Sequence, residues 1–112
     1  MIQLQKAPVL SIEITEIKVF PVNEEKLKAY VTIVLNHCFV IRDLKVIAGA
    51  GGLFVAMPSK RRKDGTFKDI AHPVNHSTRA LFERKVLDAY SYEIERLGGN
   101  AILSALEAES GE

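Results

Sequence analysis

The sequence predicts an α+β domain in which an antiparallel sheet of about five strands is followed by a C-terminal helix packed on one face. Strand-like segments fill residues 11–71, apolar residues recur at helical spacing after residue 77, and no strand–helix–strand alternation appears. A chain of 112 residues suits one domain with one hydrophobic core. Because one helix leaves a sheet face or a strand edge uncovered, we also expect a homodimer, intertwined or paired through its sheets.

Two strands are predicted before residue 36. Segment 11–20 is rich in β-branched residues, and its apolar residues change phase between Ile14 and Ile17. This change indicates a bulge or a strand that is buried on both faces. Segment 27–35 alternates between apolar and polar residues and predicts a half-buried strand. Asn36-His37 is the expected tight connection to the next strand.

Three more strands are predicted up to residue 71. Segment 39–47 is the third strand, with Val40, Leu44 and Val46 expected on one face. The glycine-rich break at 49–52 precedes a fourth strand at 53–57, which Pro58 should end. After a turn at Asp64-Gly65, segment 66–71 is a weaker fifth strand.

The helix is predicted from about Ser77 to Leu97. Apolar residues at three- and four-residue steps form its stripe, namely Phe82, Val86, Tyr90, Ile94 and Leu97. Asn75 or Ser77 can cap its start, and Gly98-Gly99 should end it. The expected organisation is therefore an N-terminal extension at 1–10, a domain at 11–97 and an acidic extension at 98–112, with a short second helix as one option for the last segment.

Charge is unevenly distributed, although the formal net charge is only +1. Residues 57–87 carry eight lysines and arginines against three acids, whereas residues 88–112 carry one against six. This indicates a middle segment that faces anions. The single cysteine fits a reducing compartment, and neither a signal peptide nor an apolar run of about 20 residues is present. We therefore expect a cytoplasmic protein with no membrane partner.

Four consecutive cations, Lys60-Arg61-Arg62-Lys63, precede the turn at Asp64-Gly65. A turn that carries cations can lie along a nucleic-acid backbone, where each phosphate contact releases a condensed counterion. The same charges would also suit a solvated hairpin tip that prevents edge-to-edge aggregation. The charge pattern by itself leaves both interpretations open.

The stretch GLFVAMPSKRRKDGTFKDIAHPVN, residues 52–75, closely resembles the signature of the stage V sporulation protein G family. The upstream FVIRDLKVI and the spacing into STR resemble the family too, so the resemblance covers roughly residues 12–97. It implies a dimeric bacterial regulator with an antiparallel sheet and a C-terminal helix. Members of the family bind DNA, some bind RNA, and they influence septation, sporulation or surface traits. The resemblance implies neither catalytic activity nor a cofactor.

The resemblance also implies which residues form the site. Lys60 and Arg61 match the family's basic pair after MPS, Lys68 matches a basic position, and Arg79 falls where the helix opens. Arg62-Lys63 departs from the family, which often has a neutral residue and a proline there, and this raises the local charge. We therefore predict a nucleic-acid-binding site at Lys60, Arg61, Arg62, Lys63, Lys68 and Arg79. Arg84 and Lys85 would either widen this site or pair with acids along the helix.

Other kinds of site have weaker support in the sequence. Pro73 prevents a regular helix from presenting His72 and His76 on one face, so we expect no metal site. No paired carboxylates and no nucleophile–base pair suggest catalytic residues, so we expect no enzyme. The alternative function is a regulator of cell division whose basic loop docks on an acidic protein partner.

Five single residues complete the expectations. Phe39 and Phe67 would stack on bases if their faces were open. Cys38 is expected to be a half-buried apolar residue. Asp43 and Asp69 are each expected to pair with Arg42 or Arg61, or to cap a turn.

Overall fold

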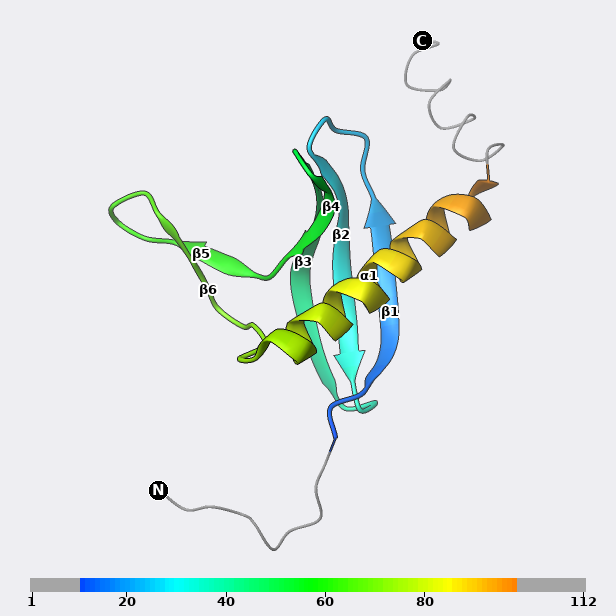
Figure 1. The fold of residues 1–112 in the computed structure, drawn as a ribbon, viewed down its shortest axis with the longest axis horizontal. Coiled ribbons are helices and arrows are strands. Elements are labelled where there is room, and N and C mark those ends of the chain that lie inside the picture. Colours follow the sequence, from blue (N-terminus) through cyan, green and yellow to red (C-terminus); the bar gives the residue numbers. More distant parts are fainter. Residues whose placement is uncertain (1–10, 99–112) are drawn as a thin grey trace, which may run out of the picture.

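The computed structural model describes residues 11–98 and confirms the α+β class (Figure 1). An antiparallel sheet has the strand order β1-β2-β3-β4, and a separate hairpin consists of β5 and β6. The elements are β1 Ile14–Pro21, β2 Leu27–Leu35, β3 Phe39–Gly49, β4 Gly52–Ala56, β5 Ser59–Arg61, β6 Phe67–Asp69 and α1 His76–Arg96. The predicted extensions at 1–10 and 98–112 lie outside the described residues, apart from Gly98.

The fifth predicted strand does not join the main sheet. The segment predicted at 66–71 contains β6, which pairs with the unpredicted strand β5. Pro58 has no backbone N–H to donate to the sheet, and it follows Met57, the last buried residue after β4. The chain therefore leaves the four-stranded sheet at this point and forms its own two-stranded sheet.

Bulges decide which residues face the helix. The β1–β2 register shifts between Ile14 and Glu16, which confirms the bulge predicted from the change of phase in this segment. A second shift places Arg42 and Asp43 of β3 opposite the single residue Thr32, and Asp43 has φ +68°. This bulge was not predicted.

The bulge in β3 makes one face prediction wrong. Leu44 and Val46 are buried as expected, but Val40 is 47% exposed. The extra residue turns Val40 to the opposite face of the sheet, where it pairs with Val34. Ile41 packs against the core instead.

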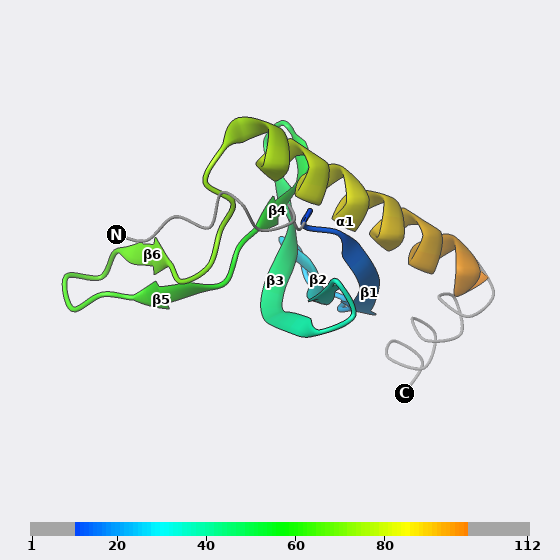
Figure 2. The same cartoon turned by 90° about the horizontal axis from the view of Figure 1, so that it is seen from below.

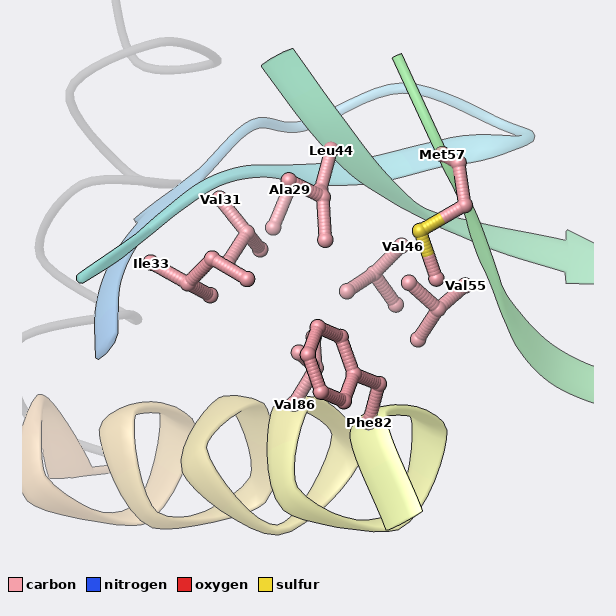
Figure 3. Close-up of a cluster of buried hydrophobic side chains, with 9 residues drawn as sticks. All are labelled: Ala29, Val31, Ile33, Leu44, Val46, Val55, Met57, Phe82 and Val86. Carbon is pink, nitrogen blue, oxygen red and sulfur yellow. The ribbon is translucent and has the colours of Figure 1, made fainter. Parts of the chain in front are cut away.

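The core lies between one face of the sheet and α1 (Figure 3). Its buried members are Ala29, Val31, Ile33, Leu44, Val46, Val55, Met57, Phe82 and Val86. Each fully buried aliphatic or phenyl side chain contributes about 1.5–3 kcal/mol of transfer free energy. The predicted apolar stripe of the helix is confirmed for its first three members, because Phe82 and Val86 point into this core and Tyr90 packs at its edge. Ile94 and Leu97 are partly buried but do not belong to this cluster.

Local capping explains where the helix begins and ends. Asn75 is the N-cap, and its side-chain oxygen accepts a hydrogen bond of 2.8 Å from the backbone N–H of Thr78. Leu97 is the C-cap and Gly98 follows with φ +64°, a left-handed conformation that glycine adopts at little cost. Both predicted signals are therefore confirmed at the level of single residues.

The connection between β2 and β3 is the predicted tight turn. Asn36 and His37 have φ values of 51° and 58°, and the N–H of Cys38 donates to the carbonyl of Leu35 at 2.9 Å. Two successive left-handed residues are typical of a two-residue type I′ hairpin. Cys38 itself is exposed, so the expectation that it is half-buried is wrong, because the turn carries it away from the core.

Candidate nucleic-acid interface

The hairpin β5–β6 projects away from the four-stranded sheet and from α1 (Figures 1 and 2). Every residue of β5 and of β6 is exposed. The chain enters the hairpin directly after buried Met57, and it leaves the hairpin toward Asn75 at the start of α1. The core and the helix therefore hold the base of the hairpin, while its tip is open to solvent.

The geometry of the tip follows from Asp64-Gly65. The N–H of Gly65 donates to the carbonyl of Arg62 at 3.0 Å, and the N–H of Arg62 donates to the carbonyl of Thr66 at 2.6 Å. Gly65 has φ +91°, so the loop is a tight turn followed by a left-handed glycine, a common three-residue hairpin connection. The predicted turn is confirmed. Arg62 lies at the base of this loop, paired with Thr66, and Lys63 is its first residue.

Asp64 stabilises this tip rather than neutralising its cations. Its Oδ1 accepts hydrogen bonds from the hydroxyl of Thr66 at 2.6 Å and from the backbone N–H of Thr66 at 3.0 Å. These bonds stabilise the ionised carboxylate and lower the pKa of Asp64 below its ordinary value. The carboxylate forms no ion pair within 4.0 Å with a described cation.

The structure brings together five of the six predicted site residues. Lys60 and Arg61 lie in β5, Arg62 and Lys63 in the loop, and Lys68 in β6. Together they line a surface hollow of about 460 Å³ that also includes Asp69 and Ile70. Among residues 11–98, no acid forms an ion pair within 4.0 Å with any of these five cations.

Lys60 and Lys68 are direct cross-strand partners. Their side chains share one face of the hairpin, whereas Arg61 and Phe67 form the next pair on the other face. Like charges directly opposite each other destabilise a strand pair. The hairpin therefore holds a lysine pair that disfavours its own fold and favours an anion between the two ammonium groups.

Arg79 occupies a different position from the other predicted residues. It lies in the first turn of α1, and its Nη2 is 3.9 Å from Oδ2 of Asp69. Asp69 therefore pairs with Arg79, and the predicted partners Arg42 and Arg61 are wrong. The ion pair joins β6 to the helix, so Arg79 positions the hairpin and has less free charge to offer a ligand.

Two other cations of α1, Arg84 and Lys85, have no such partner among the described residues. Arg84 and Lys85 are exposed, and neither forms an ion pair within 4.0 Å with a described acid. Glu83, the acid that precedes them on the helix, instead accepts a 3.3 Å hydrogen bond from the backbone N–H of Val55 in β4. Glu83 thus joins the helix to the sheet edge.

The remaining candidates are placed as follows. Nδ1 of His72 lies 2.8 Å from the carbonyl oxygen of Pro73, a local contact in the segment that precedes α1. Phe39 and Phe67 are 62% and 69% exposed. Within residues 11–98, no group of three or more metal-ligating side chains occurs. No helix in the described part is long and apolar enough to cross a membrane.

Sequence reasoning missed a second hollow, of about 460 Å³, on the sheet face opposite α1. Tyr30, Asp43 and Lys45 line it from the sheet, and Ser59 and Phe67 line it from the hairpin. The strict alternation of 27–35 placed Tyr30 on the outer face. The other lining residues could not be predicted, because their positions depend on the unpredicted bulge at Asp43 and on the separate hairpin.

Comparison with known sequences identifies relatives over most of the chain. A sequence model of the SpoVG family matches residues 12–92. A protein named "Putative septation protein SpoVG" from Anaeromyxobacter sp. (strain K) is 71% identical over 86 residues, which cover 77% of this chain and 85% of the relative. Relatives with the same name occur in Bdellovibrio bacteriovorus, at 63% identity over 77% of this chain and 80% of the relative. In Bacillus velezensis the identity is 47% over 86% of this chain and 96% of the relative.

Proposed function

The chain belongs to the SpoVG family, and from this premise we propose that it is a cytoplasmic regulator that binds nucleic acid. DNA is the expected polymer and RNA the second one to test. The names of the relatives connect them with septation, and we extend that connection to this chain as part of the proposal. The observation that carries it is the projecting hairpin, whose five cations lack ion pairs with the described acids.

Charge and shape together support a phosphate ligand. Residues 58–70 contain five cations and two acids, so the hairpin has a net charge of +3 in a chain of net +1. One of these acids is hydrogen-bonded to Thr66, and the other is paired with Arg79. The cations remain available to phosphates, and a narrow two-stranded arm can follow a nucleic-acid backbone or enter a groove.

The expected mode of binding is electrostatic. The cations come from a short hairpin, and α1, the helix of residues 11–98, contains neither asparagine nor glutamine, two residue types by which recognition helices read bases. Phosphate contacts fix position but carry little sequence information. We therefore propose modest sequence specificity and a steep dependence of affinity on salt concentration.

A homodimer is part of the proposal. Ile70 and Val74, which follow the hairpin, are 68% and 88% exposed. A mainly apolar hollow of about 330 Å³ lies beside them, on the helix side of the sheet, between Ile12, Ile70 and Phe82. A second copy that covers this surface would bury exposed apolar area and bring two cationic hairpins into one particle. Light scattering on wild type and Ile70→Asp tests this, since the substitution should shift the mass toward the monomer.

The main experiment is fluorescence anisotropy with labelled duplex DNA and single-stranded RNA across a salt series. The test variant replaces all four cations of Lys60–Lys63 by alanine. A matched control removes four exposed cations elsewhere, at Lys18, Lys26, Arg42 and Arg96. Both variants have the same net charge, so only the position of the lost cations differs between them.

The proposal expects wild type and the control variant to bind with steep salt dependence and the hairpin variant to lose most of its affinity. Equal losses in both variants would mean that overall charge, not the hairpin, drives binding. Absence of binding by wild type would refute the function. The hairpin would then be better explained as a docking surface for an acidic protein in the division machinery.

A further inference from the structure

The second hollow lies on the face of the sheet that α1 does not cover. Figure 2 shows α1 on one side of the sheet and the hairpin projecting beyond β3 and β4. Tyr30 and Lys45 are cross-strand partners on the outer face, and Phe67 reaches the same hollow from β6. The hollow therefore joins the sheet to the face of the hairpin that carries Arg61, the cross-strand partner of Phe67.

Two aromatic rings border this hollow and remain open to solvent. Tyr30 is 42% exposed and Phe67 is 69% exposed. Phe20, the cross-strand partner of Tyr30, is 53% exposed and extends the aromatic row to β1. Exposed aromatic rings beside cations are the pattern by which proteins stack unpaired bases.

The polar groups of the hollow are not satisfied by the chain itself. The carboxylate of Asp43 and the ammonium of Lys45 form no ion pair within 4.0 Å with a described residue, although they are only two positions apart. Asp43 is held at φ +68° by the bulge of β3, an uncommon conformation for a residue other than glycine. Such outliers concentrate at ligand sites. The bulge thus places the Asp43 carboxylate, a hydrogen-bond acceptor, in the lining of a hollow that also contains aromatic and basic side chains.

These features favour a nucleotide over another protein surface. An acidic peptide would meet the Asp43 carboxylate. A second copy could pair Asp43 with Lys45 across a two-fold axis, and light scattering distinguishes that occupant from a nucleotide. A nucleotide instead offers a base to the rings, N–H donors to the carboxylate, and phosphates to Lys45 and Arg61.

We propose that this hollow binds one unpaired nucleobase, stacked between Tyr30 and Phe67 and hydrogen-bonded to Asp43. This inference rests on the proposed nucleic-acid binding and gives it a preference for single strands. Guanine fits best, because its neighbouring N1–H and N2–H donors match the two oxygens of a carboxylate, whereas uracil offers one N–H between two acceptors.

The test measures anisotropy of labelled 12-nucleotide strands that are all uridine or carry one central guanine, in RNA and DNA forms, beside a duplex DNA. Phe67→Ala and Tyr30→Ala should weaken binding of the guanine-containing strand by roughly 5- to 150-fold and leave duplex binding within about twofold. Asp43→Asn keeps a residue that tolerates the left-handed conformation, and it should abolish the preference for guanine over uridine. The RNA and DNA arms show which sugar is preferred.

Tyr92→Ala is the matched control, because Tyr92 is 66% exposed on α1 and does not line the hollow, and it should leave every affinity unchanged. Equal loss of duplex and single-strand binding in Phe67→Ala would overturn the inference while leaving the proposed function in place. So would a fall in particle mass of that variant by light scattering, which would make Phe67 a self-association residue. Absence of binding to every strand and to the duplex would refute the inference together with the proposed function.

Discussion

Replacement of Lys68 by glutamine should weaken nucleic-acid binding without weakening the fold. Lys68 lies directly opposite Lys60, and both side chains are exposed on one face of the hairpin. The backbone pairs Pro58–Ile70 and Arg62–Thr66 are hydrogen-bonded, so Lys60–Lys68, midway between them, is also of the hydrogen-bonded type, with Cα atoms about 5.5 Å apart. Glutamine keeps a polar, unbranched side chain that is one atom shorter than that of lysine, and it removes the charge.

The magnitude follows from the number of cations. If all five hairpin cations contact phosphates of duplex DNA, the logarithm of affinity falls with the logarithm of salt concentration with a slope of about −4.5. A change from 50 to 200 mM salt then weakens binding by roughly 500-fold. Removal of one contact reduces the slope to about −3.6, and the same salt change costs roughly 150-fold. Relief of the like-charge pair stabilises the hairpin by about 0.2–1 kcal/mol.

The assay combines two measurements on the same variant. Anisotropy with labelled duplex DNA across the salt series gives the slope, and thermal unfolding by circular dichroism gives the melting temperature. Lys18→Gln is the matched control, because Lys18 is exposed in β1 and lies 3.8 Å from Glu16, away from the hairpin. The control should leave the slope unchanged.

The signature is a shallower slope with an equal or higher melting temperature. A slope that remained unchanged in Lys68→Gln would show that this lysine contacts no phosphate. A shallower slope accompanied by a lower melting temperature would mean that Lys68 affects binding by stabilising the folded hairpin. The argument from the opposed lysine pair would then fail.

Three further predictions concern the scaffold. Ile33→Ala leaves a cavity under α1 and should destabilise the protein by about 2–5 kcal/mol in urea unfolding; a loss below about 1 kcal/mol would contradict full burial of this side chain. Asn75→Ala removes the helix cap and should lower the free energy of unfolding by about 0.5–2 kcal/mol, whereas Asn75→Asp should retain most of the capping stabilisation. Equal losses of stability in both variants would argue against the hydrogen bond from Thr78. In an NMR titration the carboxyl of Asp64 should have a pKa below 3.8, and Thr66→Val should raise it toward that value. Because the pKa of Asp64 is lowered in the folded state, its contribution to stability is present above pH 3.8 and is lost as the pH falls through the lower pKa of the folded state. A titration midpoint at or above 3.8 would contradict the hydrogen bonds to Thr66.

Local signals in the sequence predicted much of the fold. Strict alternation placed β2 at its observed bounds, and Asn36-His37, Asn75 and Gly98 each occupy the position that their backbone preferences favour. These signals depend on one residue and its neighbours, so a sequence reveals them directly.

The errors arise where tertiary pairing decides the outcome. The exposure of Val40 depends on one extra residue at Asp43, which alternation alone does not reveal. The partner of Asp69 is Arg79, and the contact forms only because α1 begins near the base of the hairpin. The cluster of cations was visible in the sequence, but the opposed Lys60–Lys68 pair requires the strand register.

The complete exposure of β5 and β6 also bears on how such a domain can change over evolutionary time. A substitution in the buried face of β2 must preserve volume against its neighbours, whereas a substitution in the hairpin meets mainly water. Selection can therefore alter the charge and the ligand preference of this arm with little effect on folding. Divergence of targets between relatives should accordingly concentrate at hairpin positions such as Arg62 and Lys63, where this chain departs from the family signature, while the sheet and the helix remain a common frame.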